Sequence, residues 1–483
     1  MNYSIESSLR ILRNADLGNE MPDLQEAAKT LTGEDFPASK RQQSKTNIRS
    51  TTKPALKSLT KPLLEELRST LASDPGDSDV DCWAQKLLRV CEVRKSSLRE
   101  RLLEQQMSTR ELQQKTLALV CFFLKYFDKS RDARFVNVAL KLVDQRWLLH
   151  PDKATKLADG NCDSIACLTL ACNVLLDKAL FDLENSDVNN DVKVELAAIT
   201  DSTNSYQPIP CTTNKSVIVF SPSRFSLYSM ASTEMLVRNG VKIEAIVVRR
   251  LFNPRRAVSE FRRDGKRLIK KVWNKLVLRK RAYKAEYQYK TLPQVLESLS
   301  VAEKSLDELA ARHGIPVVYC NTLNDDVVHK QLEASRPDAV VFTGGGILRE
   351  KTLSLAGDGV LNCHIGQLPH YRGMDVVEWP LLENRVDSLG FTVHFMAKGI
   401  DTGDILNIFP IGIDLASNIT DLRRKCEAHM SCAMVQTVTR FLNGQCPRFS
   451  QSSKDGKQYF IIHERLREIA ERRLEKAIRE TAS

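Results

Sequence analysis

Three side chains in the C-terminal part of the chain have types and spacing suited to acyl chemistry. Asn362 and His364 are two residues apart at the end of the apolar run 359–361, and Asp401 follows further along. If the run is a β-strand, side chains two residues apart project from the same face of it. An amide and a charged imidazole can both donate hydrogen bonds to a developing oxyanion. A carboxylate can orient the imidazole and accept a proton.

Each of these residues also has a purely structural explanation. Asn362 fits a turn at a strand end, His364 fits a buried histidine with satisfied hydrogen bonds, and Asp401 fits a simple turn. Taken singly, the structural explanation is favoured for each. Their occurrence together and in order favours a catalytic set. Cys363, which lies between the first two, is expected to point the opposite way into packing and not to act as a nucleophile.

The sequence around these residues forms an ordered set of motifs. Leu368-Pro369-His370-Tyr371-Arg372-Gly373 comes first, then Gly390-Phe391-Thr392-Val393-His394, then Asp401-Thr402-Gly403-Asp404-Ile405. The set closely resembles the folate-dependent formyltransferase family, which includes the methionyl-tRNA, glycinamide-ribonucleotide and nucleotide-sugar formyltransferases. The resemblance covers about residues 215–412 and is densest over 338–406. The family often has Ser and Leu where this chain has Gly366 and Gln367.

The resemblance implies formyl transfer from 10-formyltetrahydrofolate to a primary amine, without a metal and without a covalent enzyme intermediate. It implies that Asn362, His364 and Asp401 are catalytic. It also implies a folate pocket that reads the pterin largely through backbone groups, formed by Gly345, Gly346, Ile347, Leu348, Leu368, Pro369, Ala397, Lys398, Gly399 and Ile400. The glycine run lacks the spacing of a nucleotide phosphate loop, and a tight turn explains it equally well.

Two cationic or titratable side chains next to the catalytic strand are candidates for binding the acceptor. His370 and Arg372 lie in the Leu-Pro motif, where either could meet an anionic group such as a phosphate. The competing explanation is a surface salt bridge, and the sequence does not separate the two.

The sequence from residue 215 onward alternates between strand and helix patterns. Apolar runs predict strands at 217–220, 243–248, 316–319 and 339–342, and helical patterns predict helices at 225–239 and 324–335. Further along we expect a strand at 405–413, a helix at 420–442, a strand at 458–462 and a terminal helix at 463–479. This β-α-β succession predicts an α/β, Rossmann-like core with a mostly parallel sheet. Ligands of such sheets bind at the carboxyl ends of the strands.

The remaining residues predict the domain organisation. Residues 1–60 are polar and indicate disorder or a linker, whereas 61–185 have leucines at helical spacing and predict an all-helical domain of unknown role. Residues 186–214 read as a second linker. The catalytic domain is expected at 215–412, with a basic helical insertion at 249–290. A short helical C-terminal extension follows at 413–483.

The positive charge of the chain is concentrated in that insertion. Residues 249–284 carry a net charge of +13, whereas the whole chain of 483 residues carries +11, so the remainder carries −2. Apolar pairs recur every four residues between Leu268 and Val277, which predicts a cationic amphipathic helix. Such a helix can contact an anionic membrane surface, bind RNA phosphates, or pack on its own domain. Packing on its own domain is the favoured alternative.

Cysteine usage and hydropathy predict a cytoplasmic protein. Twelve cysteines are scattered without a Cys-x-x-Cys pair, which suggests reduced thiols and not a disulfide framework. No run approaches the roughly 18 apolar residues of a membrane span. The N-terminus lacks the basic-then-apolar pattern of a signal peptide.

The acceptor follows less directly from the sequence. Methionyl-tRNA formyltransferases carry a sizeable C-terminal β-barrel domain for tRNA, whereas here only about 70 residues, with a helical pattern, follow the core. A small amine acceptor, such as an amino sugar on a nucleotide, is therefore favoured over methionyl-tRNA. The alternative of another class is a non-catalytic scaffold or RNA-binding protein on the same fold.

Overall fold

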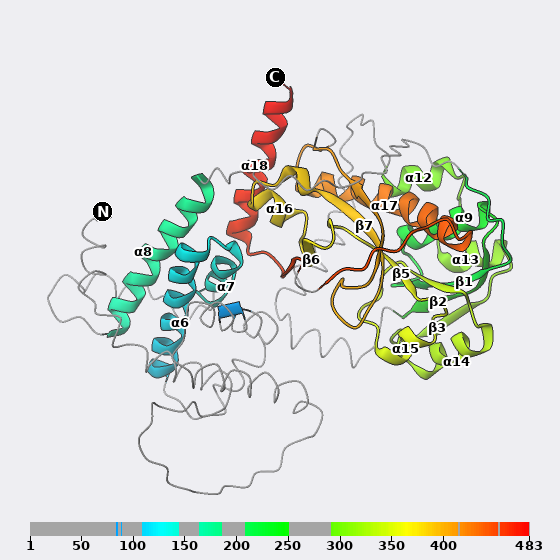
Figure 1. Ribbon diagram of the computed structural model, residues 1–483, viewed down its shortest axis with the longest axis horizontal. Coiled ribbons are helices and arrows are strands. Elements are labelled where there is room, and N and C mark those ends of the chain that lie inside the picture. Colours follow the sequence, from blue (N-terminus) through cyan, green and yellow to red (C-terminus); the bar gives the residue numbers. More distant parts are fainter. Residues whose placement is uncertain are drawn as a thin grey trace, which may run out of the picture. The chain divides into compact units, whose positions relative to one another are not determined.

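The computed structural model describes residues 84–85, 88, 109–143, 164–185, 208–250, 291–413, 416–452 and 455–482. The chain divides into two compact units, Met1–Ser186 and Asp187–Ser483 (Figure 1). The predicted linker 1–60, most of the second linker, and residues 251–290 of the basic insertion lie outside the described residues. No helix in the described ranges is long and apolar enough to cross a membrane.

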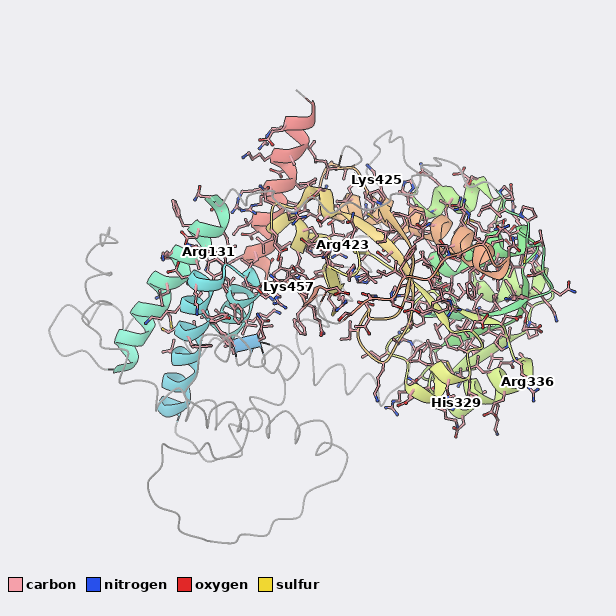
Figure 2. All side chains as sticks on the ribbon, in the orientation of Figure 1. Arg131, His329, Arg336, Arg423, Lys425 and Lys457 are labelled. Carbon is pink, nitrogen blue, oxygen red and sulfur yellow. The ribbon has the colours of Figure 1, made fainter. Side chains whose placement is uncertain are left out.

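The described residues of the first unit are mostly helical. The helices described there over their whole length are α6 (Thr109–Ser130), α7 (Ala133–Val143) and α8 (Ser164–Asn185). Aromatic rings fill the space between α6 and α7, where Tyr126 and Phe135 lie edge to face with centroids 4.6 Å apart. The Arg131 guanidinium, labelled in Figure 2, lies 2.6 Å from the Asp182 carboxylate and so joins the end of α6 to α8.

The second unit is built on a seven-stranded, mostly parallel sheet, as the sequence predicts. Its order is β3-β2-β1-β4-β5-β7-β8; β1 to β5 are parallel and β7 runs antiparallel to β5. Apolar strands of this kind suit a sheet covered on both faces. The strands are β1 (Ser216–Ser221), β2 (Lys242–Arg249), β3 (Val317–Cys320), β4 (Ala339–Phe342), β5 (Val360–His364), β7 (Gly390–Phe395) and β8 (Ile405–Pro410).

Helices cover both faces of this sheet (Figure 1). One face carries α9 (Leu227–Arg238), α12 (Leu292–Ser298), α13 (Leu306–Arg312) and α17 (Ile419–Leu442). The other carries α14 (Asp326–Ser335) and α15 (Glu350–Ser354). Ile218 and Phe220 of β1 belong to the buried cluster that includes Val328 and Leu332 of α14. Alternate side chains of β1 therefore point to opposite helical layers.

Several element boundaries differ from their predicted positions. Helix α9 begins at Leu227 because the side chain of Ser226 accepts a hydrogen bond from Ser229 N and caps the helix. Strand β8 ends at Pro410, three residues before the predicted end, although Ile411 N still donates to the Leu389 carbonyl at 3.0 Å. The predicted strand at 458–462 is observed as the shorter β9 (Lys457–Tyr459).

The residues after the sheet pack back onto the same unit. Helix α17 contacts β5 and β7, and β9 pairs in parallel with β6 (Tyr371–Gly373) in a separate two-stranded sheet. Helix α18 (Glu464–Ala482) packs against α16 (Glu378–Leu382). A 3₁₀ turn, η4 (Val386–Ser388), leads into β7.

A buried ion pair ties α17 to α16. Glu378 is 1% exposed, and both of its carboxylate oxygens accept hydrogen bonds from the Arg423 guanidinium, which is labelled in Figure 2. The same guanidinium donates to Asp375, which in turn accepts from Ile462 N at 3.0 Å, just before α18. Burial raises the pKa of Glu378, whereas the arginine lowers it. Arg467 lies 3.6 Å from the same carboxylate, so Arg423 is the closer of these two cationic partners.

We expect Arg423→Met to lower the free energy of unfolding by about 3–5 kcal/mol, because it removes one partner of a buried ion pair. The double variant Arg423→Met/Glu378→Gln should recover a large part of the loss, since no buried charge remains. Urea denaturation followed by tryptophan fluorescence measures both. An equal loss in the single and double variants would mean that the pair adds nothing specific.

Candidate active site on strands β5 and β7

Strands β5 and β7 bring the polar candidates onto one face of the sheet. In the antiparallel register Asn362 lies opposite His394, and His364 lies opposite Thr392. The first two residues of β5 are fully buried and hold the strand in the core. As predicted from their spacing, Asn362 and His364 project from the same face. Cys363 is buried on the other side near Tyr228 and Cys426, and burial raises the pKa of its thiol.

Asp401 reaches this face from the β7–β8 loop. One carboxylate oxygen, Oδ2, lies 3.5 Å from His364 Nδ1, and the other, Oδ1, lies 3.7 Å from His394 Nε2. Gly373 N donates a hydrogen bond of 2.9 Å to Oδ2. The backbone of Asp401 is left-handed, with φ +52°, a conformation that aspartate tolerates better than most residues. The structure therefore brings the three predicted catalytic side chains together.

The hydrogen bonds of His364 define how its ring is held. Nε2 lies 2.8 Å from the Tyr371 carbonyl oxygen, which can only accept, so Nε2 carries a hydrogen and donates it. Nδ1 faces the Asp401 carboxylate, which also only accepts. The two ring nitrogens of His364 thus face two acceptors, a backbone carbonyl and a carboxylate, which fix the orientation of the ring.

His394 orients the amide of Asn362. His394 Nδ1 donates a hydrogen bond of 2.7 Å to the Phe395 carbonyl, which leaves Nε2 with a lone pair. That lone pair accepts from Asn362 Nδ2 at 3.2 Å. Burial lowers the pKa of His394 to about 4, and Asp401 opposes this. The neutral ring therefore fixes one amide hydrogen of Asn362 and leaves the second directed elsewhere, available to a ligand.

The role of His394 is not predicted from the sequence, although the residue lies within the motif 390–394. The available signal was the rule used for Asn362 and His364, since Thr392 and His394 are also two residues apart on an apolar strand. The register of β5 against β7, which brings His394 opposite Asn362, is a long-range property of the fold.

The predicted folate-binding residues lie on three loops around this face. Gly345 and Gly346 follow β4 with φ of +134° and +109°, and the Arg249 guanidinium donates to the Gly345 carbonyl at 2.5 Å. Ile347 is 82% exposed, whereas the side chain of Leu348 is buried in the core. The predicted residues after β7, namely Ala397, Lys398, Gly399 and Ile400, are exposed.

The third loop is the Leu-Pro motif, and its geometry explains the departure at Gly366. Leu368 is buried, the Leu368–Pro369 peptide is cis, and Leu368 N donates to Thr392 Oγ1 at 3.1 Å. A Cβ on Gly366 would lie 2.8 Å from His364 Nε2 and 2.9 Å from the Tyr371 carbonyl oxygen. A serine would therefore displace the histidine ring from its present position.

The two predicted acceptor-binding residues differ in their surroundings. Arg372 is 3% exposed, and its guanidinium donates to Gln451 Oε1 at 3.0 Å and to the Ser452 carbonyl at 2.5 Å. His370 is half-buried, and burial together with Arg385 lowers its pKa. The structure thus directs Arg372 into the segment that follows β8 and α17. Acceptor binding by either residue stays a prediction.

The described ranges contain no cluster of three or more histidine, cysteine or acidic side chains that could hold a metal ion. The geometry of the site consists of an amide, two imidazoles, a carboxylate and backbone groups.

The sequence of this unit matches a known protein family. Residues 290–438 match the family model described as formyl transferase. A methionyl-tRNA formyltransferase from Chlamydia pneumoniae is 32% identical over 148 residues, which is 30% of this chain and 45% of the relative. Another from Desulforamulus reducens is 27% identical over 147 residues, which is 30% and 46% respectively. The chain thus spans a little under half the length of these curated relatives.

Solved structures of low sequence identity are also similar. Glycinamide ribonucleotide transformylase 1 from Symbiobacterium toebii is 19% identical, covers 48% of this chain and 89% of its own, and has a TM-score of 0.32. The sugar 3N-formyl transferase WlaRD, solved with dTDP and 5-N-formyl-THF, is 16% identical and covers 51% and 70%, with a TM-score of 0.31.

The buried neutral His394 predicts a pH dependence of stability. Its pKa in the folded protein is below the unfolded value, so between the two values the unfolded chain binds the additional proton. Stability should therefore fall as pH decreases from about 6.5 towards 4. In His394→Gln, whose amide oxygen can still accept from Asn362, this part of the loss should be absent. Urea denaturation at pH 7 and pH 5 compares the two, and equal pH dependence would contradict the assignment.

Proposed function

From its membership of the formyl transferase family, we propose that this chain transfers a formyl group from 10-formyltetrahydrofolate to a primary amine. The single observation that carries the proposal is the grouping of Asn362, His364 and Asp401 around one face of β5 and β7. His364 lies at ion-pair distance from Asp401, and His394 orients the Asn362 amide. These are the donors and the base that formyl transfer to an amine requires.

The loops around the site fit a folate co-substrate. Large apolar side chains are left in solvent there, with Ile347 82% and Ile400 48% exposed, and a bound aromatic ring system would cover them. The glycine turn after β4 presents backbone without side chains, which allows close approach. When bound, 10-formyltetrahydrofolate supplies the formyl carbon. The residues proposed to hold it are those of the three loops described above.

The side chains of this site then have distinct tasks. As the amine attacks, negative charge develops on the formyl oxygen, and the second N–H of Asn362 is positioned to stabilise it. His364, whose two ring nitrogens face the Tyr371 carbonyl and the Asp401 carboxylate, holds that carboxylate in place. The Asp401 carboxylate accepts the proton that the amine loses, directly or through water. It can return this proton to the departing nitrogen, so the carboxylate ends in its starting state.

A small amine is the first candidate acceptor, as the sequence favours. The residues after β8 support this proposal, because α17, β9 and α18 are used in packing on the catalytic unit itself. Methionyl-tRNA is the second candidate, and the names of the curated relatives favour it. The basic segment 249–284, which would contact an anionic surface or RNA, lies mostly outside the described residues.

We propose a cytoplasmic location, in keeping with the free thiols of the described cysteines.

The direct test incubates purified protein with formyl-labelled 10-formyltetrahydrofolate and one amine at a time. Nucleotide-linked amino sugars, glycinamide ribonucleotide and methionyl-tRNA cover the acceptor classes, and mass spectrometry detects the formylated product. Formylation of one small amine supports the first candidate. A protein that neither binds folate nor formylates any amine would instead be a scaffold or RNA-binding protein.

We expect Asn362→Ala to lower turnover about 10²- to 10³-fold, because it removes a donor to the developing oxyanion. We expect His364→Ala to lower turnover by about 10²-fold, because Asp401 loses the ring that holds it in position. Circular dichroism should show unchanged folding, and the KM for folate should change little. Wild-type turnover in either variant would exclude that residue from the chemistry.

Asp401→Asn keeps the shape of the side chain and removes its charge and basicity. Turnover should fall by at least about 10²-fold, the lower end of what acid–base catalysis contributes. Folate affinity, measured by calorimetry, should persist because the proposed pocket is mostly backbone. If folate binding disappears while the protein stays folded, Asp401 is a binding residue instead.

A further inference from the structure

We propose that Gln451 is a positioning residue for the reaction, which holds the left-handed turn that presents Asp401 to His364. The kinetic part of this inference rests on the proposed formyl transfer. The structural part does not, because it concerns the relation of Gln451 to the Asp401 loop alone.

Gln451 holds this loop through its amide nitrogen. Nε2 donates to the Asp401 carbonyl at 3.1 Å and to the Gly403 carbonyl at 2.6 Å. The amide orientation is fixed independently, because the Arg372 guanidinium has only donors and faces Oε1. With Oε1 committed to the arginine, both N–H groups are free to bind the two carbonyls. One side chain therefore holds both ends of the turn 401–403.

The turn needs this support because its backbone is unfavourable. Asp401 has φ +52°, and a non-glycine residue held there costs of the order of 1 kcal/mol or more. Gly403 is also constrained, since a Cβ at this position would lie 1.9 Å from the Phe395 carbonyl oxygen. The direction of the Asp401 carboxylate follows directly from these dihedral angles. A relaxed turn would move it away from the His364 ring.

Gln451 is itself held on both sides. Phe449 exchanges backbone hydrogen bonds of 2.8 and 2.9 Å with Ile405 of β8. After Gln451, strand β9 pairs with β6, which contains Gly373, the backbone donor to the Asp401 carboxylate. Both supports of Asp401, at its main chain and its side chain, therefore depend on residues 449–459. Arg372 in turn fixes the side chain of Gln451, so this arginine of the Leu-Pro motif has a structural role.

The test uses Gln451→Met, which keeps length and volume but cannot donate to the two carbonyls. Gln331→Met is the matched control, because Gln331 lies on α14 and, among the residues that the structure describes, its side chain hydrogen-bonds to Ser335 of the same helix and not to the Asp401 turn. We expect Gln451→Met to lower kcat by about 10²-fold, the effect of misplacing a catalytic group by roughly 1 Å. The KM for folate should stay within about twofold. The control should match the wild type.

A double-mutant cycle separates positioning from general support. If Gln451 acts through Asp401, adding Gln451→Met to Asp401→Asn should lower kcat no further. Additive losses in the cycle would overturn the inference. Gln451→Glu is the second variant, should the methionine variant not fold. It still accepts from Arg372 but cannot donate to the carbonyls, so the same loss of kcat is expected.

A spectroscopic measurement keeps the test independent of the reaction. In protein with labelled histidine, the His364 ring signal at pH 7 is identified by its absence in His364→Gln. Asp401→Asn should move this signal, and Gln451→Met should move it in the same direction, whereas Gln331→Met should not. An unmoved signal in folded Gln451→Met overturns the inference. If the wild type formylates no amine, the proposed function fails and this measurement still decides the role of Gln451.

Discussion

The site depends on one carboxylate placed between two buried imidazoles. His364 is 7% exposed and His394 is 1% exposed, and Asp401 lies within 3.7 Å of a ring nitrogen of each. A buried polar ring is stable only when its nitrogens have partners. Asp401 is the partner of His364 Nδ1, and the Tyr371 carbonyl is the partner of Nε2. His394 is deeply buried and donates a hydrogen bond to a carbonyl, so it stays neutral and accepts a hydrogen bond from Asn362. Two identical ring types thus have different tasks because their partners differ.

The antiparallel strand β7 creates this geometry. The parallel strands β1 to β5 end at one edge of the sheet, and the Asn362–His364 half of β5 lies towards that edge. Because β7 runs in the opposite direction, its end lies near the start of β5, where Met396 N donates to the Val360 carbonyl. The β7–β8 loop must then fold back across the sheet face for Asp401 to reach His364. In a purely parallel sheet the strand next to β5 would end at the same edge as β5, and the loop after it would not cross the sheet face in this way.

Local patterns in the sequence predict the strands and the common face of the site residues. Apolar runs such as Val217–Phe220 identified the strands, because strands of a sheet covered on both faces are apolar along their length. The two-residue spacing of Asn362 and His364 predicted their common face. Gln451 was not predicted, because its role requires a long-range contact with Asp401. The predicted start of the helix at 225–239 moved because the N-cap residue Ser226 sets where α9 begins.

The supports of the site extend beyond the part of the chain that matches the family. The match ends at residue 438, yet Gln451 bonds the Asp401 turn, and Gly373 lies against Tyr459 so closely that a Cβ would be 2.2 Å from its carbonyl oxygen. A Cβ on Gly456 would likewise lie 1.8 Å from the Pro369 carbonyl oxygen. Close backbone contacts of this kind exclude larger residues at both glycines. Residues 449–452 and 455–459 therefore fix two of the loops around the candidate site, although they lie beyond the part that matches the family.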